Sequence, residues 1–258
     1  MLLVLDIGNT NIKTGIFNNN KLLYSWRLTT DLMRTSDEYG VQMESFFNHL
    51  KISTDCIDGI VMSSVIPSIN YTIEHMCSLY FHGLTPAIVN ESIKTNLKNL
   101  YDNPDKLGAD RICNSVAAYH IYGGPCIVVD FGTATTFNVI SEKGEFKGGI
   151  IFPGMKVAAE ALTNRTALLP KIEFVKPSNV IATNTSDAIQ SGMINGYVGM
   201  VEHMINLINE EANEKHIVIA TGGMSTMLAN ESNIVDFISP TLTLQGLAII
   251  AKLNSIAN

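Results

Sequence analysis

Two short polar turns, each directly after an unbroken apolar run, carry the residues best suited to chemistry. The run LLVL leads into DIGNTN at 6–11, and CIVV leads into DFGTATT at 130–136. Glycine lets a backbone approach a phosphate closely, and turn amides and hydroxyls can donate hydrogen bonds to it. The sequence therefore indicates two phosphate-binding turns, although an ordinary hairpin remains the alternative interpretation of each turn taken alone.

The charged residues of the first turn suit a nucleotide with its metal. Lys13, on the returning strand, could reach a terminal phosphate as a point charge. Asp6 would repel phosphate, so its expected role is to hold a magnesium ion through water.

The second turn repeats this arrangement. Gly132 and Thr133 occupy the equivalent places, and Thr135 and Thr136 add hydroxyls. A pair of such turns suits a nucleoside triphosphate, and neither the P-loop pattern nor G-x-G-x-x-G occurs in the chain. A third glycine turn, ATGGM at 220–224, could bring a base or ribose against the backbone, or could be a simple strand-to-helix turn.

The stretch LGADR at 107–111 offers a catalytic carboxylate. Asp110 could act as the base for a substrate hydroxyl, with Arg111 binding a substrate carboxylate. The alternative makes Asp110 a helix N-cap and Arg111 a solvated side chain.

The element pattern predicts an α/β protein with one unit occurring twice. Apolar runs predict three-stranded meanders at 2–30 and 126–154, each followed by helices and further strands at 58–67, 87–90 and 216–223. Helices are predicted at 35–51, 68–81, 109–124, 185–214 and 242–256. The two turns lie close to half the chain apart, so we expect two domains, 1–112 and 113–258.

The composition narrows the class of protein. Acidic residues outnumber basic ones by 24 to 17, and the net charge of −7 disfavours a broad nucleic-acid surface. No apolar stretch approaches the length of a membrane span, and the first residues do not form a signal peptide. Four cysteines without C-x-x-C spacing indicate a cytoplasmic protein with reduced thiols.

Together these motifs resemble those of one family, the type III pantothenate kinases of the acetate and sugar kinase/Hsp70/actin superfamily. The resemblance covers nearly the whole chain. Its segments are DIGNTNIK at 6–13, SSVIP at 63–67, YDNPDKLGADR at 101–111, DFGTATTFNVI at 130–140, GGIIFPG at 148–154, NTSDAIQSG at 184–192 and ATGG at 220–223.

The resemblance implies a fold and an activity. The fold would be two actin-like (ribonuclease H-like) domains from a duplicated unit, with a nucleotide cleft between the domains. The activity would be ATP-dependent phosphorylation of pantothenate to 4′-phosphopantothenate, the first step of coenzyme A biosynthesis. Mg²⁺ with ATP, a monovalent cation (K⁺ or NH₄⁺) and a homodimeric assembly are implied as well.

The resemblance also implies roles for individual residues. The proton acceptor would be Asp110, and the ligand of the monovalent cation would be Asp130. ATP would be bound by Asp6, Ile7, Gly8, Asn9, Thr10, Asn11, Ile12, Lys13 and Thr133. Pantothenate would be bound by Tyr101, Gly108, Ala109, Asp110, Arg111 and Thr185.

Two features bear on assembly and on the substrate pocket. Gly192, Gly196 and Gly199 line one helix, where the residues alone fit either packing within a domain or a subunit interface, and the resemblance favours the interface. Phe152 and the pair Ala182-Thr183 depart from the family's usual residues. A kinase for another small alcohol, a phosphohydrolase and a nucleotide-binding regulator remain the rival hypotheses.

Overall fold

The computed structural model describes residues 1–257 and divides into two compact units. Unit 1 comprises Met1–His120 and the segment from Leu242 to the C-terminus, and unit 2 comprises Ile121–Thr241. This division differs from the expected boundary at residue 112. The difference arises because helix α3 belongs to unit 1 through His120 and because the last helix, α7 (Leu242–Leu253), returns to unit 1.

Each unit is built on a sheet with the same strand order. In unit 1 the order is β3-β2-β1-β4-β5, and in unit 2 the strands run β9-β8-β7-β10-β11. In both, the first three strands form an antiparallel meander and the remaining strands pair in parallel. The predicted α/β class and the duplicated meander are therefore confirmed.

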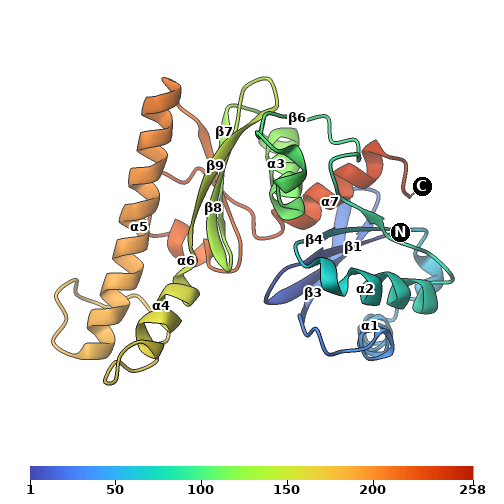
Figure 1. The fold of residues 1–258 in the computed structure, drawn as a ribbon, viewed down its shortest axis with the longest axis horizontal. Coiled ribbons are helices and arrows are strands. Elements are labelled where there is room, and N and C mark those ends of the chain that lie inside the picture. The colour runs from blue at the N-terminus through green and yellow to red at the C-terminus, as the bar shows by residue number, and fades with distance from the viewer. Residues whose placement is uncertain (258) are drawn as a thin grey trace. The chain divides into compact units, whose positions relative to one another are not determined.

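In unit 1 the meander is followed by helices and further strands (Figure 1). Its sheet strands are β1 (Leu2–Ile7), β2 (Asn11–Asn18), β3 (Lys21–Thr29), β4 (Gly59–Ser64) and β5 (Ala87–Ile88). The short strand β6 (Lys98–Asn99) also falls within residues 1–120 but is not part of this five-stranded sheet. The helices of unit 1 are α1 (Ser36–Leu50), α2 (Pro67–Tyr80), α3 (Ala109–Tyr122, which ends just inside unit 2) and α7, with single-turn 3₁₀ helices at Thr54–Cys56 and Pro104–Lys106.

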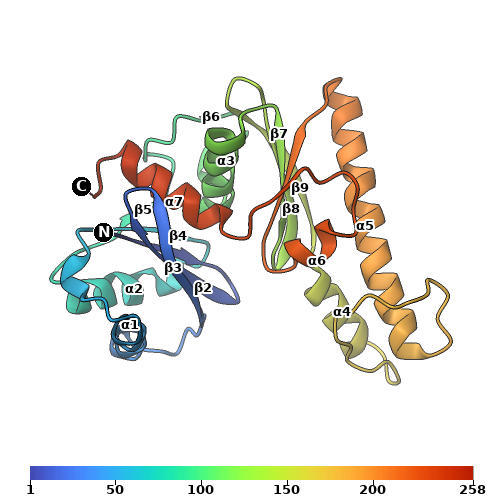
Figure 2. The same cartoon turned by 180° about the vertical axis from the view of Figure 1, so that it is seen from behind.

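Unit 2 contains the second meander and the longest helix (Figure 2). Its strands are β7 (Cys126–Phe131), β8 (Ala134–Ile140), β9 (Glu145–Pro153), β10 (Ile217–Thr221) and β11 (Phe237–Ile238). Its helices are α4 (Met155–Asn164), α5 (Thr185–Ala212) and α6 (Ser225–Ala229). The sequence did not predict α4, α6, β6 or β11.

The sheet of unit 1 is apolar on both faces, and this explains why β1 has no polar residue before Asp6. Leu3, Leu5 and Ile7 point into a core with α1 and α2. Leu2 and Val4 point to the opposite face, into a core with α3 and α7. A strand buried on both faces reads as a continuous apolar run.

Helix α7 packs unusually closely on α3 within unit 1. A Cβ atom at Gly246 would lie 2.0 Å from the Cys113 carbonyl oxygen, so only glycine allows this backbone approach. The contact holds the first turns of α3 against the sheet face that carries Asp6.

Candidate active site

Asp6 is a buried carboxylate that has a polar partner on each oxygen. It is 4% exposed. Its Oδ1 accepts a 2.8 Å hydrogen bond from the Ser63 hydroxyl, and Lys13 Nζ lies 3.1 Å from its Oδ2. Both partners are placed by the sheet, because Asp6 is the register partner of Lys13 on β2 and of Ser63 on β4. A buried charge is tolerated only with such partners, so the carboxylate is fixed in place.

The turn between β1 and β2 has a defined shape and an open surface. The Gly8 amide donates to the Asn11 carbonyl at 3.1 Å, and the Thr30 hydroxyl donates to the Gly8 carbonyl at 2.6 Å. Asn9 and Thr10 at its tip are exposed. These bonds hold the turn in one shape, and its exposed tip is open to a ligand.

Two of the predicted ATP-binding residues have side chains that cannot reach a ligand. Ile7 and Ile12 are register partners, and both lie in the core against α1 and α2. They can contribute backbone groups only.

Arg111 is buried, so the interpretation of it as a solvated residue is wrong. It is 6% exposed, and its guanidinium carbon lies 5.7 Å from the centroid of the Tyr101 ring. A guanidinium over an aromatic face is a favourable cation–π arrangement. The structure thus brings two predicted substrate residues into contact.

Asp110 lies in the first turn of α3, which begins at Ala109. Its Oδ1 accepts a 2.8 Å hydrogen bond from the Arg111 amide, so the carboxylate partly fills a capping role at a position favoured by the helix dipole. A Cβ atom at Gly108 would lie 2.5 Å from this Oδ1 and 3.9 Å from Val65 Cγ1. Glycine at 108 therefore leaves the room that the carboxylate occupies, and Ala109 is buried beside it.

The Cys113 thiol on α3 is buried. Burial raises the pKa of this thiol well above its ordinary value, and the charges of Asp6 and Asp110 raise it further, against the opposite effect of the Ser63 hydroxyl. The thiol stays protonated. The charges of both acids therefore reach this buried thiol, which follows Asp110 by one turn of α3.

Unit 2 has a related strand end at Asp130, which is half-buried on β7. Its register partners are Thr136 on β8 and Thr221 on β10. A Cβ atom at Gly222, whose φ is +93°, would lie 2.4 Å from Asp130 Oδ1. The ATGG turn therefore presses against this carboxylate and requires glycine at 222 for both space and conformation.

The second turn is shorter than the first, with Gly132 and Thr133 between β7 and β8. Thr133 is exposed, and its carbonyl accepts a 3.0 Å hydrogen bond from the Gly154 amide. Thr135, by contrast, is 1% exposed and pairs with the core residue Phe131. Alternation along the strand turns its hydroxyl away from the Asp130 face, so the expectation that Thr135 serves this site is wrong.

Thr185 lies in unit 2, in the exposed first turn of α5. The preceding Asn184 caps this helix by accepting a 2.9 Å hydrogen bond from the Asp187 amide. Residues 1–257 contain no group of three or more His, Cys, Asp or Glu side chains that could hold a metal ion, and no helix among them is suited to span a membrane.

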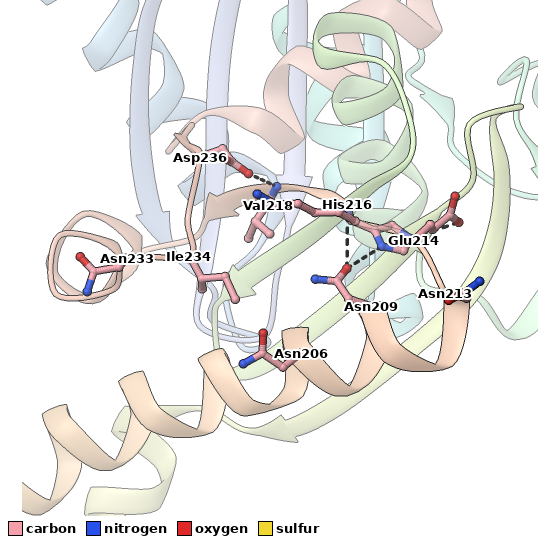
Figure 3. Close-up of a pocket in the computed structure, with 10 residues that line it drawn as sticks. Asn206, Asn209, Asn213, Glu214, His216, Val218, Asn233, Ile234 and Asp236 are labelled. Atoms are coloured by element: carbon pink, nitrogen blue, oxygen red, sulfur yellow. Dashed lines mark hydrogen bonds and ion pairs between the residues drawn. The ribbon is translucent and has the colours of Figure 1, made fainter.

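A polar hollow of about 610 Å³ lies elsewhere in unit 2 (Figure 3). It is lined by the last turns of α5, the start of β10 and residues 233–236. Since Thr221 is at the other end of β10, this hollow is separate from the Asp130 site. His216 in its wall is 2% exposed, and its Nδ1 lies 2.8 Å from Asn209 Oδ1.

Sequence reasoning missed three features of these sites: Ser63, Cys113 and the contact of Gly222 with Asp130. The SSVIP segment is part of the family resemblance, but the sequence assigns Ser63 no role. The available signal for Ser63 is a hydroxyl residue near the end of β4, the strand that pairs in parallel with the Asp6 strand. The pairing of Lys13 with Asp6 was also foreseeable, because a three-residue turn sets these two residues opposite each other.

Solved structures with similar folds define the class of protein. A conserved Baf-family protein from Campylobacter jejuni, described as a candidate transcriptional activator, has a TM-score of 0.62 at 20% identity, over 98% of both chains. The activator of 2-hydroxyisocaproyl-CoA dehydratase from Clostridium difficile, with bound ADPNP, has a TM-score of 0.53 at 11% identity, over 100% of this chain and 98% of that chain. At these identities the likeness shows the fold alone, which is the actin-like α/β class.

Sequence comparison then shows the family. The family model for type III pantothenate kinase matches residues 2–207. A type III pantothenate kinase from Bacillus cytotoxicus is 46% identical over 256 residues, covering 99% of this chain and 97% of the relative. The chain belongs to the type III pantothenate kinase family.

His216 predicts how the stability of the protein depends on pH. Burial lowers the pKa of His216 below its ordinary value of 6.5, against a smaller opposite effect of Glu214. The unfolded chain therefore binds a proton more readily than the folded one, and the free energy of unfolding should fall as the pH drops below about 6.5.

The measurement is the melting temperature of wild type and His216→Asn between pH 7.5 and 5.5. The asparagine can still donate to Asn209 but cannot take up a proton, so its melting temperature should fall less over this range. His203→Asn, an exposed change on α5, is the control and should behave as wild type. Parallel curves for His216→Asn and wild type would contradict the prediction.

Proposed function

We propose that this chain uses Asp110 to transfer the γ-phosphoryl group of ATP to the primary hydroxyl of pantothenate, giving 4′-phosphopantothenate. Pantothenate kinase activity in coenzyme A biosynthesis is the function of the family to which the chain belongs. The observation that carries the residue assignment is the Asp110 carboxylate at the start of α3, held by the Arg111 amide next to the buried Arg111 guanidinium and the Tyr101 ring.

Asp110 is the proton acceptor. As the hydroxyl oxygen of pantothenate bonds to the γ-phosphorus, the bond from that phosphorus to the bridging oxygen of ADP breaks, and the hydroxyl proton passes to the carboxylate. Phosphoryl transfer depends mainly on positioning and on charge stabilisation, so a base held by the Arg111 amide suits the step.

Arg111 and Tyr101 bind the substrate. The guanidinium is the natural partner for the carboxylate of pantothenate, because its planar donors match a carboxylate geometrically. Its burial and its stacking on Tyr101 hold it in one orientation. Thr185 is a further substrate contact suggested by the family resemblance.

ATP is bound by the two turns. The segment from Asp6 to Lys13 binds it through the exposed turn amides and hydroxyls, and Lys13 moves from Asp6 to a phosphate oxygen when the nucleotide binds. Thr133 is exposed on the second turn and contacts the same nucleotide.

Asp6 fits a magnesium ion held through water. Its Oδ1 keeps the Ser63 hydroxyl as a partner when Lys13 leaves, and the residue is buried, so an ion bound through water suits it better than direct coordination. Magnesium keeps several waters and is commonly bound by one or two carboxylates together with substrate phosphates. When bound, the ion would neutralise charge on the phosphate oxygens.

Asp130 fits a monovalent cation, K⁺ or NH₄⁺. The carboxylate is half-buried, and Gly222 leaves beside it a space that a Cβ atom would fill. A carboxylate near the nucleotide would repel phosphate without a cation. The two strand-end acids would therefore serve different ions.

A homodimer is the assembly we propose. Among residues 1–257, and apart from the nearby backbone of α5 itself, no atom lies within 4 Å of a Cβ placed at Gly192, Gly196 or Gly199, so this face of α5 can accept another helix closely. Leu168 and Ile181, in the segment between α4 and α5, are 91% and 87% exposed, which favours a partner that covers them. The cytoplasm is the expected compartment, since all four cysteines are free thiols.

Replacing Asp110 by asparagine tests the assignment of the proton acceptor. The asparagine side chain can still accept from the Arg111 amide, so the fold and the binding of pantothenate should persist. The kcat should fall by about 100- to 10,000-fold because the base is lost. The assay is ADP release with ATP and pantothenate, alongside calorimetric binding of pantothenate.

Asp105→Asn is the matched control, since Asp105 is an exposed acid in the preceding loop. Near-normal kcat in Asp110→Asn would remove Asp110 from its role. Wild-type ADP release with sugars but not with pantothenate would refute the proposed substrate.

Replacing Asp130 by asparagine tests the cation site. Wild type should need K⁺ or NH₄⁺ for full activity, and Asp130→Asn should have low activity that added K⁺ no longer raises, because the ligand charge is gone. Turnover is measured across a K⁺ titration at constant ionic strength. Glu210→Gln, which removes an exposed charge in the same unit, should keep the wild-type response to K⁺. A normal K⁺ response in Asp130→Asn would place the cation elsewhere.

A further inference from the structure

Ser63 is buried at the end of β4 and contacts the carboxylate of Asp6. The residue is 0% exposed, and its hydroxyl donates a 2.8 Å hydrogen bond to Asp6 Oδ1. Strand pairing sets this contact, since Ser63 and Asp6 are register partners in the parallel ladder of β4 and β1. The hydroxyl is therefore delivered to the carboxylate by the backbone and needs no flexible side chain.

The surroundings of Ser63 direct its hydrogen to Asp6. The Asp6 carboxylate accepts this hydrogen bond at Oδ1 and forms an ion pair with Lys13 at Oδ2. Hydrogen bonds to an ionised acceptor are the strong ones, so this bond restrains the rotation of the carboxylate.

The adjacent serine has a different task. The Ser64 hydroxyl donates to the Ile66 carbonyl and accepts from the Ile66 amide, at 3.3 and 3.2 Å, and so it shapes the loop that leads into α2. Of these two neighbouring serines, Ser63 therefore contacts the acid and Ser64 contacts the backbone.

The duplicated unit repeats the placement. Thr221 ends β10, is 1% exposed, and is the register partner of Asp130 across the parallel ladder of β10 and β7. A hydroxyl residue therefore stands beside the strand-end acid in both units, although the two units have little sequence in common. A merely space-filling residue would not need a hydroxyl in either place.

We propose that Ser63 is a positioning residue that holds Asp6 in the orientation needed to bind the hydrated magnesium ion of the nucleotide. The inference rests on the proposed function. Lys13 competes for the same carboxylate from the side of Oδ2. With Ser63 present, Oδ1 stays fixed when Lys13 leaves for a phosphate. Without Ser63, the carboxylate turns freely toward Lys13, and the magnesium ion has to displace a stronger ion pair.

The test compares Ser63→Ala with Ser64→Ala and with Ser63→Thr, the residue type that the second unit uses. ATP binding is measured by calorimetry over a range of Mg²⁺ concentrations, and turnover with pantothenate is measured over the same range. Ser63→Ala should need about tenfold more Mg²⁺ for half-maximal ATP binding and turnover, the effect of losing one charged hydrogen bond. Ser63→Thr and Ser64→Ala should both have the wild-type Mg²⁺ requirement, because the first keeps a hydroxyl beside Asp6 and the second leaves Ser63 unchanged.

Each outcome decides between alternatives. An unchanged Mg²⁺ requirement in Ser63→Ala overturns the proposal, and so does an equal change in Ser64→Ala, because that would indicate a structural role only. If Ser63→Ala does not fold, Ser63→Cys is used and is held to the same expectation. If wild type binds MgATP but does not phosphorylate pantothenate, the proposed function fails while the calorimetric comparison still tests Ser63.

Discussion

The structure depends on the stabilisation of one buried negative charge at the end of a strand. Asp6 follows a run of residues buried on both faces of a sheet, where an ionised carboxylate without partners would be very costly. Ser63 and Lys13 supply those partners, and both are placed by the two strands that flank β1. The meander and the parallel strand thus act together to make this carboxylate tolerable, and the glycine turn beyond it gives access to a ligand.

Asp110, the proposed proton acceptor, belongs to the same unit as Asp6. Helix α3 is held against the Asp6 face of the sheet by α7, whose Gly246 permits backbone contact with Cys113. This packing brings the first turn of α3, with Asp110, close to the thiol that Asp6 also influences. The return of α7 to the first unit is therefore part of the packing that positions Asp110, the proposed proton acceptor.

Much of this could be predicted from the sequence, and the rest required contacts between distant segments. Apolar runs and turn residues predict both meanders because strand periodicity is local, and the motifs were specific enough to indicate the family. The burial of Arg111 was not predictable, because it depends on Tyr101 ten residues earlier. Nor was the return of α7, whose apolar face packs on Leu2 and Val4. The short helices α4 and α6 have no side-chain N-cap, so they lack the usual starting signal.

The central claim is that Asp6 and Asp110 act on one reaction, the first through the metal of the nucleotide and the second through the substrate hydroxyl. The most direct measurement is a crystal structure with Mg²⁺, a non-hydrolysable ATP analogue and pantothenate. The account predicts that the Asp110 carboxylate is within hydrogen-bond distance of the primary hydroxyl of pantothenate, and that Asp6 contacts a water bound to magnesium. A triphosphate bound away from the turn at Gly8–Asn11, or a pantothenate hydroxyl out of reach of Asp110, would contradict it.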